Sequence, residues 1–326
     1  MTDAIGGYFG EEELTGKFNT FIHEDGALLN LGRNAFKYIC MSIPRRVKKV
    51  YIPYYTCPVV WRSLFWTGLE YFYHINMDLE IAEDIQLGED DYIVVNNYFG
   101  IKDAYIKQMA EKYGNHLIID NAQAFYAPVI PDTYAFYSPR KFFGVPDGGV
   151  AYVTHEAQAV SCNEQDDSYG RLRHLQLRKE KGAEAGFAMY QSNENKLDYM
   201  PMLKMSEYTH DVLKGIDYET AKERRRANYK ILHNALSKKN ELSLPKMDDF
   251  VCPMVYPFIG QNDNGVLRKA LKDNRIYTAT YWPNIDNFRG DNTNEEYLAH
   301  HIIPLPIDQR YGKEEMNRII LTINNV

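Results

Sequence analysis

Short apolar runs that alternate with helical patterns constrain the fold of this chain more than any other feature. Residues 92–96 and 116–119 are apolar runs of strand length, and residues 101–113 between them have apolar side chains at helical spacing. The same alternation predicts further strands at 49–52, 69–73, 135–137 and 150–153, and further helices at 33–40 and 58–66. Strands separated by helices favour a mainly parallel sheet with helices on both faces. We therefore expect an α/β fold with three layers, α/β/α.

The length of the chain allows two domains. Its 326 residues are 45% hydrophobic, which is enough for a large core and a second, smaller one. We expect a large domain over residues 1–204, a long connecting helix over 205–240 that begins near Ser206, and a smaller C-terminal α+β domain over 241–326. In that last part the patterns predict strands at 250–256 and 276–280, and helices at 264–274 and 313–324.

Two charged stretches predict surface features. Residues 155–200 are polar and weakly periodic, which is typical of a surface excursion or a mobile loop. Residues 223–226, Glu-Arg-Arg-Arg, fall on the expected long helix. Charge runs on helices are usually solvated, so we expect these arginines to face solvent or another subunit.

Composition excludes several classes of function. The net charge is −7 and no polybasic block is present, which argues against nucleic-acid binding. No apolar run approaches the length that spans a membrane, and the first residues lack the pattern of a signal peptide. The four cysteines are far apart and the histidines show no ligand spacing, so we expect no metal site and a cytoplasmic protein.

A carboxylate and a lysine are the first candidates for chemistry. Asp120 ends an expected central strand, where open α/β sheets bind ligands, although a helix N-cap is an equally ordinary role for it. Lys141 is flanked by Tyr137, Phe142 and Phe143, which would desolvate its amine and favour a nucleophile. A surface lysine is the alternative. Together the two residues are the minimum equipment for pyridoxal phosphate (PLP): a lysine for the Schiff base and a carboxylate for the pyridine nitrogen.

An anion site is expected beside this pair. Gly32, Arg33 and Asn34 open an expected helix, and the N–H groups at such a start bind phosphate, although every helix has such an end. Ser138 could donate a hydroxyl to the same phosphate, or be a simple turn residue. The glycine pair 148–149 permits a close backbone approach beside a ligand.

Taken in order, these segments resemble the DegT/DnrJ family of PLP-dependent sugar aminotransferases, within the fold-type I aminotransferase class. The resemblance covers most of the chain and rests on 31–35 (LGRNA), 53–57 (PYYTC), 96–100 (NNYFG), 119–123 (IDNAQ), 141–149, 204–207 (KMSE) and 303–306 (IPLP). It implies catalytic roles for Lys141, as the Schiff-base lysine, and for Asp120, as the partner of the pyridine nitrogen. It implies that PLP is bound by Gly32, Arg33, Asn34, Tyr55, Cys57, Asn97, Asp120, Gln123, Ser138 and Lys141.

The resemblance also implies a function and partners. We expect a homodimeric enzyme of sugar biosynthesis that moves an amino group from an amino acid, taken as glutamate, to a keto-sugar, taken as nucleotide-linked. The alternative is a degenerate PLP-binding sensor or assembly protein of the same fold.

The sequence departs from the family pattern at four places. Cys57 replaces an aromatic residue that stacks on the ring, where Tyr55 is a possible substitute, and Phe136 replaces a serine. Met202 and Leu203 replace an Asn-Tyr pair, and residues 281–283 replace a His-Tyr-like stretch. The half of the pattern that concerns the cofactor is therefore kept better than the half that concerns the sugar.

Overall fold

A seven-stranded sheet forms the centre of the molecule. The computed structural model describes residues 3–44, 46–64, 67–261, 263–288 and 293–326. Its large sheet has the strand order β2-β8-β7-β6-β5-β3-β4. The strands are β2 (Ala27–Leu29), β3 (Lys49–Pro53), β4 (Glu70–Tyr73), β5 (Asp91–Asn96), β6 (Leu117–Asn121), β7 (Tyr134–Tyr137) and β8 (Gly149–Tyr152). Strands β4, β3, β5, β6 and β7 run parallel, and β8 is antiparallel to both β7 and β2, so the expected mainly parallel sheet is confirmed.

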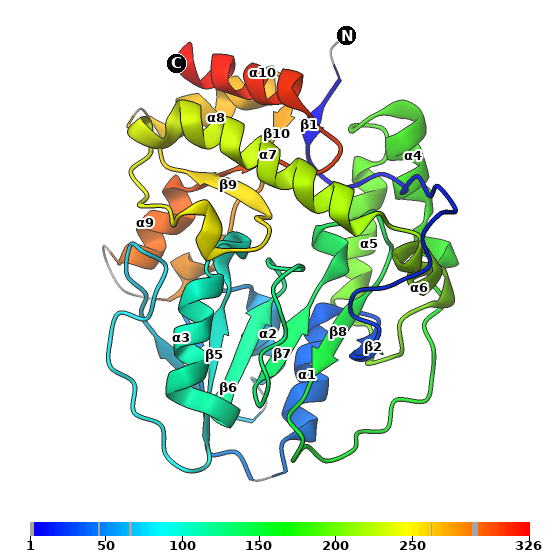
Figure 1. The fold of residues 1–326 in the computed structure, drawn as a ribbon, viewed down its shortest axis with the longest axis vertical. Coiled ribbons are helices and arrows are strands. Elements are labelled where there is room, and N and C mark those ends of the chain that lie inside the picture. The colour runs from blue at the N-terminus through cyan, green and yellow to red at the C-terminus, as the bar shows by residue number, and fades with distance from the viewer. Residues whose placement is uncertain (1–2, 45, 65–66, 262, 289–292) are drawn as a thin grey trace.

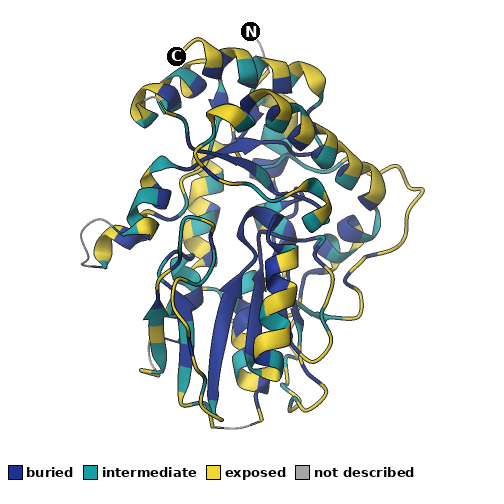
Figure 2. Cartoon of the chain, turned by 60° about the vertical axis from the view of Figure 1, so that its left-hand side comes forward, coloured by how far each residue is buried: buried dark blue, intermediate teal, exposed yellow. Residues whose placement is uncertain are grey.

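Helices cover both faces of this sheet. Along β6, Ile118 packs with α1 (Gly32–Ser42) and α2 (Pro58–Arg62), whereas its neighbours Leu117 and Ile119 pack on the opposite side with α3 (Asp103–Tyr113). The alternation follows from the period of two along a strand, and a strand buried on both faces must be apolar throughout. Figure 2 shows these buried strands between helices whose outer faces are exposed. The expected three-layer α/β fold is confirmed. The last residues of the helix expected at 58–66 lie outside the described residues.

A second layer of structure lies at the carboxyl ends of the parallel strands. It contains two small sheets, β9 (Val255–Phe258) with β11 (Ile303–Pro306) and β1 (Ile5–Gly6) with β10 (Ile276–Tyr277). The helices here are α7 (Tyr218–Leu236), α8 (Asn264–Asp273), α9 (Asn294–His301) and α10 (Lys313–Asn324). Figure 1 shows both chain termini at this end. The N-terminal strand therefore pairs with the C-terminal part of the chain. Among the described residues no helix is long and apolar enough to cross a membrane.

Two expectations about helices were wrong. The single helix expected from Ser206 to Leu236 is two helices, α6 (Glu207–Lys214) and α7, because Asp217 starts a new helix by accepting the N–H of Thr220. The loop expected over 155–200 contains α4 (Arg173–Lys181) and α5 (Phe187–Leu197). Both are polar, and each packs a few buried side chains against the other, a pattern too weak to read as amphipathic.

The arginine run on α7 is only partly the face toward solvent or another subunit that the sequence predicted, since Arg224 is exposed but Arg225 and Arg226 are not. Arg225 is fully buried, and its guanidinium donates to the Met254 carbonyl at 3.1 Å and the Phe142 carbonyl at 3.2 Å. Its plane also lies over the Phe142 ring, 4.5 Å from the centroid. Arg226 donates to the carbonyls of Phe250 and Val251, each at 2.8 Å. Two of the arginines therefore tie α7 to other segments of the chain, since a buried guanidinium needs acceptors for its donors.

Candidate active site

The predicted lysine and carboxylate meet at one edge of the sheet. Asp120 lies at the carboxyl end of β6 on the α1 side of the sheet, and Lys141 lies in the turn that follows β7. Burial raises the pKa of the Asp120 carboxyl, and the positive charge of Lys141 opposes that rise, so the two groups lie within electrostatic reach. One oxygen, Oδ1, accepts the N–H of Ala122 at 2.8 Å, which fixes the plane of the carboxylate. The other oxygen accepts no hydrogen bond from the residues that the structure describes, so a ligand could use it.

The start of α1 and Ser138 form one side of the same site. Among the described residues no side chain caps this helix start, so N–H groups of its first turn are available to an anion. Gly32 lies against Ser138, since a β-carbon on Gly32 would stand 3.3 Å from the Ser138 Cβ. A β-carbon on Gly149 would overlap the Leu31 carbonyl. Strand β8 can therefore lie this close to the start of α1 only because residue 149 is glycine. Within the described part of the chain, the Ser138 hydroxyl makes no hydrogen bond. These groups can cradle a phosphate.

The side-chain amide of Gln123 has a buried donor that no described residue accepts. Its side chain is 4% exposed, and Oε1 accepts the N–H of Phe99 at 3.0 Å. Nε2 is buried and has no hydrogen-bond partner among the described residues. Because buried amide donors are almost always paired, this one indicates a ligand acceptor nearby.

The side chains of Arg33 and Asn34 are engaged elsewhere. The Arg33 guanidinium binds Asp198 at 2.6 Å, and Asn34 donates to the Pro201 carbonyl and to Asn30, each at 2.8 Å. Both contacts hold residues 198–201 against the start of α1. A contribution of these two residues to an anion site would therefore come from their backbone N–H groups.

Of the other three predicted residues, Cys57 lies near the site, whereas Tyr55 and Asn97 lie in the core. Tyr55 is fully buried, and its hydroxyl donates to the Tyr281 carbonyl at 2.7 Å. Its side chain is therefore held within the core. Asn97 is 1% exposed and donates to Asp103 at 2.6 Å. Cys57 is half-buried. Burial raises the pKa of its thiol and the charge of Lys141 opposes that rise, so Cys57 lies within electrostatic reach of the lysine.

A cavity of about 660 Å³ opens onto Lys141. Its walls come from the N-terminal segment, from α4 and α5, and from the C-terminal part of the chain. Sequence reasoning missed the lining residues Arg140, Arg178, Tyr190 and Arg225. Two of them belong to the stretch that was expected to be a loop, and Arg225 was expected on the surface. The only sequence pattern that marked any of these residues was the arginine run at 224–226, and it predicted that they face solvent or another subunit.

Solved structures share this fold over nearly their whole length. Spr1654 of Streptococcus pneumoniae, a candidate sugar aminotransferase in its PMP form, is 15% identical with a TM-score of 0.66, and the match covers 98% of this chain and 91% of Spr1654. The sugar aminotransferase CalS13 of Micromonospora echinospora is 14% identical with a TM-score of 0.60, over 92% of this chain and 86% of CalS13.

A third solved structure extends the likeness. A DegT DnrJ EryC1 StrS aminotransferase of Brucella abortus is 16% identical with a TM-score of 0.60, over 92% of this chain and 85% of that one. No protein-family model matches the sequence, and no curated protein matches it. The comparisons show that the chain has the fold of these aminotransferases, as the resemblance in the sequence predicted.

Proposed function

We propose that this protein is a PLP-dependent aminotransferase that moves an amino group from glutamate to a nucleotide-linked keto-sugar. The observation that carries the proposal is that Lys141 and the buried Asp120 lie within electrostatic reach of each other at the carboxyl edge of a fold-type I sheet. The neighbours support it, since CalS13 is a sugar aminotransferase and Spr1654 is known in PMP and PLP forms. Fold alone does not establish activity, so the proposal rests on the site.

The residues at the site fit PLP. Gly32, Ser138 and the uncapped start of α1 offer donors to a phosphate. The unpaired Nε2 of Gln123 is a donor for the ring oxygen of PLP, and the free oxygen of Asp120 is an acceptor for a protonated ring nitrogen. Lys141 faces the cavity from which a substrate amine would arrive. The donors and acceptors thus match the phosphate, the oxygen and the nitrogen of the cofactor.

Two residues would do the chemistry. When bound, PLP supplies an electron sink that stabilises negative charge next to the transferred nitrogen. Lys141 would hold the cofactor covalently between turnovers and, once displaced by the donor amine, would take a proton at Nζ from one carbon and return it to another. Asp120 would keep the ring nitrogen protonated, because a negative charge beside a titratable nitrogen favours its protonated form.

We also propose a cytoplasmic homodimer. The aromatic side chains of Tyr169 and Tyr199 are 69% and 90% exposed, and both lie in the stretch that includes α4 and α5. Exposed aromatic residues are enriched in protein interfaces. All four cysteines are free thiols, as in a reducing compartment. Sedimentation as a monomer at every concentration would contradict the dimer.

Visible absorbance tests the cofactor assignment. We expect purified protein reconstituted with PLP to be yellow, and Lys141→Ala to lose the visible band while keeping its fold. Lys37→Ala, which removes an exposed lysine from α1, is the matched control and should keep the band. Wild-type protein that takes up no PLP would overturn the assignment.

Addition of glutamate separates an enzyme from a PLP-binding sensor. An aminotransferase converts glutamate to its keto acid in the first half-reaction and loses the visible band as it does so. The sensor is the second candidate because Cys57 stands within electrostatic reach of Lys141 where the family has an aromatic residue. A yellow protein whose spectrum and keto-acid yield do not respond to glutamate would favour that second candidate.

A further inference from the structure

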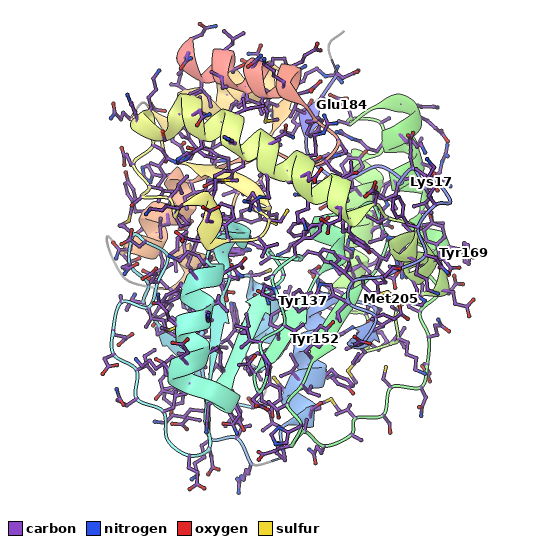
Figure 3. All side chains as sticks on the ribbon, viewed as in Figure 1. Lys17, Tyr137, Tyr152, Tyr169, Glu184 and Met205 are labelled. Atoms are coloured by element: carbon purple, nitrogen blue, oxygen red, sulfur yellow. The ribbon has the colours of Figure 1, made fainter. Side chains whose placement is uncertain are left out.

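The cavity beside Lys141 has a surplus of positive charge. Its cationic lining residues are Arg140, Lys141, Arg178, Arg225, Lys272 and Arg310. Its lining contains two carboxylates among the described residues, and each already has a partner: Asp308 binds Arg310 at 2.7 Å, and Glu184 binds Arg275 at 2.9 Å. Figure 3 shows Glu184 at the end of the molecule where β1 and α4 meet. The remaining cations therefore face the cavity without an acidic residue of the wall to neutralise them.

Internal contacts account for two of these cations. Arg140 is paired with Glu194 of α5. Arg225 is saturated by Gln309 at 2.8 Å and by the carbonyls of Met254 and Phe142. The charge of Arg140 is therefore paired, although its Nε is buried without a partner among the described residues, and all three nitrogens of Arg225 have acceptors.

Arg178 is different because it has no carboxylate partner within the described chain and a terminal nitrogen of its guanidinium is unused. Nη2 donates to the Gly6 carbonyl at 2.9 Å, whereas Nη1 is buried and has no partner within the described chain. The guanidinium carbon lies 5.5 Å from the centroid of the Tyr8 ring, and Tyr8 stacks on Tyr190 at 4.9 Å. The side chain is therefore held in one orientation at the wall of the cavity. A rigid guanidinium with a free donor is suited to a two-oxygen anion.

Lys272 adds a second cation at the same cavity. It belongs to α8, its side chain is exposed, and it makes no ion pair within the described part of the chain. An exposed ammonium contributes long-range attraction more than a fixed contact. It would draw an anion toward the cavity, and Arg178 would bind that anion.

We propose that Arg178 is the receptor for an anionic group of the substrate that reacts at Lys141, with Lys272 as a flanking cation. The inference deepens the proposed function and rests on it for the reaction at Lys141. The shared chemistry is a pair of oxygens that carry negative charge. Its source is either the distal carboxylate of a dicarboxylic amino acid or the diphosphate of a nucleotide-linked sugar. In either case Arg178 selects substrates by charge, at a distance from the bond that changes.

Binding of unreactive probes to the PLP-loaded protein tests the inference. Calorimetry with glutarate and its uncharged analogue glutaramide examines the carboxylate source, and UDP with uridine examines the diphosphate source. We expect Arg178→Gln to weaken one charged probe about tenfold or more, since a charge-assisted contact of this kind is lost, and to leave its neutral analogue unchanged. Arg173→Gln removes an exposed arginine from the same helix and should change neither probe.

Each outcome has one meaning. A loss confined to glutarate identifies the amino donor as the ligand of Arg178, and a loss confined to UDP identifies the nucleotide. Unchanged affinity, or an equal loss for charged and neutral probes, would overturn the inference, because the latter indicates that Arg178 only holds the N-terminal segment. Wild-type protein that binds neither charged probe would overturn it as well.

A second variant covers the case in which Arg178→Gln fails to fold. Arg178→Lys keeps the charge but loses the planar pair of donors, so we expect weaker binding of the same charged probe with an unchanged melting temperature. Full retention of affinity would contradict the inference. Because the probes do not react, their affinities can be measured whether or not the PLP-loaded protein converts glutamate, so a failure of the inference and a failure of the proposed activity are distinguishable.

Discussion

Acid should destabilise the protein through the buried His23. The side chain is 4% exposed, and burial lowers its pKa to about 4 from an ordinary value of 6.5. Its ring nitrogens contact the Phe125 carbonyl at 2.7 Å and the Tyr152 hydroxyl at 3.1 Å, and its ring lies 4.2 Å from that of Tyr137. Figure 3 shows the two tyrosines beside each other at the sheet. A neutral ring satisfies both contacts, with Nε2–H as donor and Nδ1 as acceptor.

The sign and size follow from proton linkage. Between pH 6.5 and about 4 the unfolded chain binds a proton at His23 and the folded chain does not, so stability falls with falling pH. The full difference in the pKa of His23 between the unfolded and folded states corresponds to about 3 kcal/mol in the free energy of unfolding. About 2 kcal/mol of this is lost between pH 7 and pH 5. Urea unfolding at a series of pH values should therefore show a steeper loss for wild type than for His23→Gln.

A surface histidine provides the control. His155 pairs with Asp132 and its side chain is 75% exposed, so His155→Gln should leave the pH profile of wild type unchanged. An NMR titration of the histidine ring protons reads the same group directly, with a midpoint near pH 4 expected for His23. Parallel stability profiles for wild type and His23→Gln, or a midpoint near 6.5, would refute the reasoning.

Three further predictions concern packing and charge. Arg225→Met should lower the free energy of unfolding by about 3 kcal/mol in a denaturant titration, because three buried acceptors lose a cationic donor. Gly149→Ala should destabilise by about 1–3 kcal/mol and weaken phosphate binding in calorimetry, since its β-carbon overlaps the Leu31 carbonyl. Equal phosphate affinity would contradict this. Glu184→Gln should cost less than about 1 kcal/mol because its pairing with Arg275 is half-exposed. That pairing lowers the pKa of Glu184 to about 2 from 4.5. Thermal melts should therefore show its contribution to stability in full above pH 4.5, and the loss of that contribution as the pH falls toward 2.

The sheet could be predicted because its strands carry a local signal. Ile93 to Val95 and Leu117 to Ile119 are apolar at every position, as a strand buried on both faces requires. Strand β2 was missed because its three residues form an edge strand that runs directly into a helix pattern. Strand length and position at the edge thus decide whether a local pattern is visible in the sequence.

The helices α4 and α5 had no such signal, because their stability comes from contacts between distant residues. His174 and Asn193 meet at 3.0 Å in a buried pair between the two helices, and neither residue type marks a helix core in a sequence. Polar helices of this kind are stabilised by tertiary contacts rather than by propensity. The same lack of local signal hid Arg178, which lies on α4.

Asp120 and Lys141 could be proposed from the sequence because Asp120 ends a recognisable strand and Lys141 follows another, and the structure places the two within electrostatic reach of each other. The choice between Tyr55 and Cys57 could not be made in advance. The two residues are two positions apart, and which of them faces the lysine depends on where β3 ends and α2 begins. A shift of a single residue at that boundary would exchange a core residue for a site residue, and sequence patterns do not locate boundaries to that precision.

The position of Lys141 is set by parts of the chain that are remote in sequence. The Phe142 carbonyl accepts donors from Arg225 on α7 and from Gln309 at 2.8 Å, and the Gly144 N–H donates to Glu12 at 2.6 Å. The turn that carries the lysine is therefore fastened to both ends of the chain, and those same ends build the cavity wall. A rotation of the C-terminal part would move the lysine and the cationic wall together, because the contacts that would have to yield are buried. The proposed anion receptor Arg178 and the proposed catalytic residue Lys141 would in this way be held at a fixed separation, without a direct contact between the two residues.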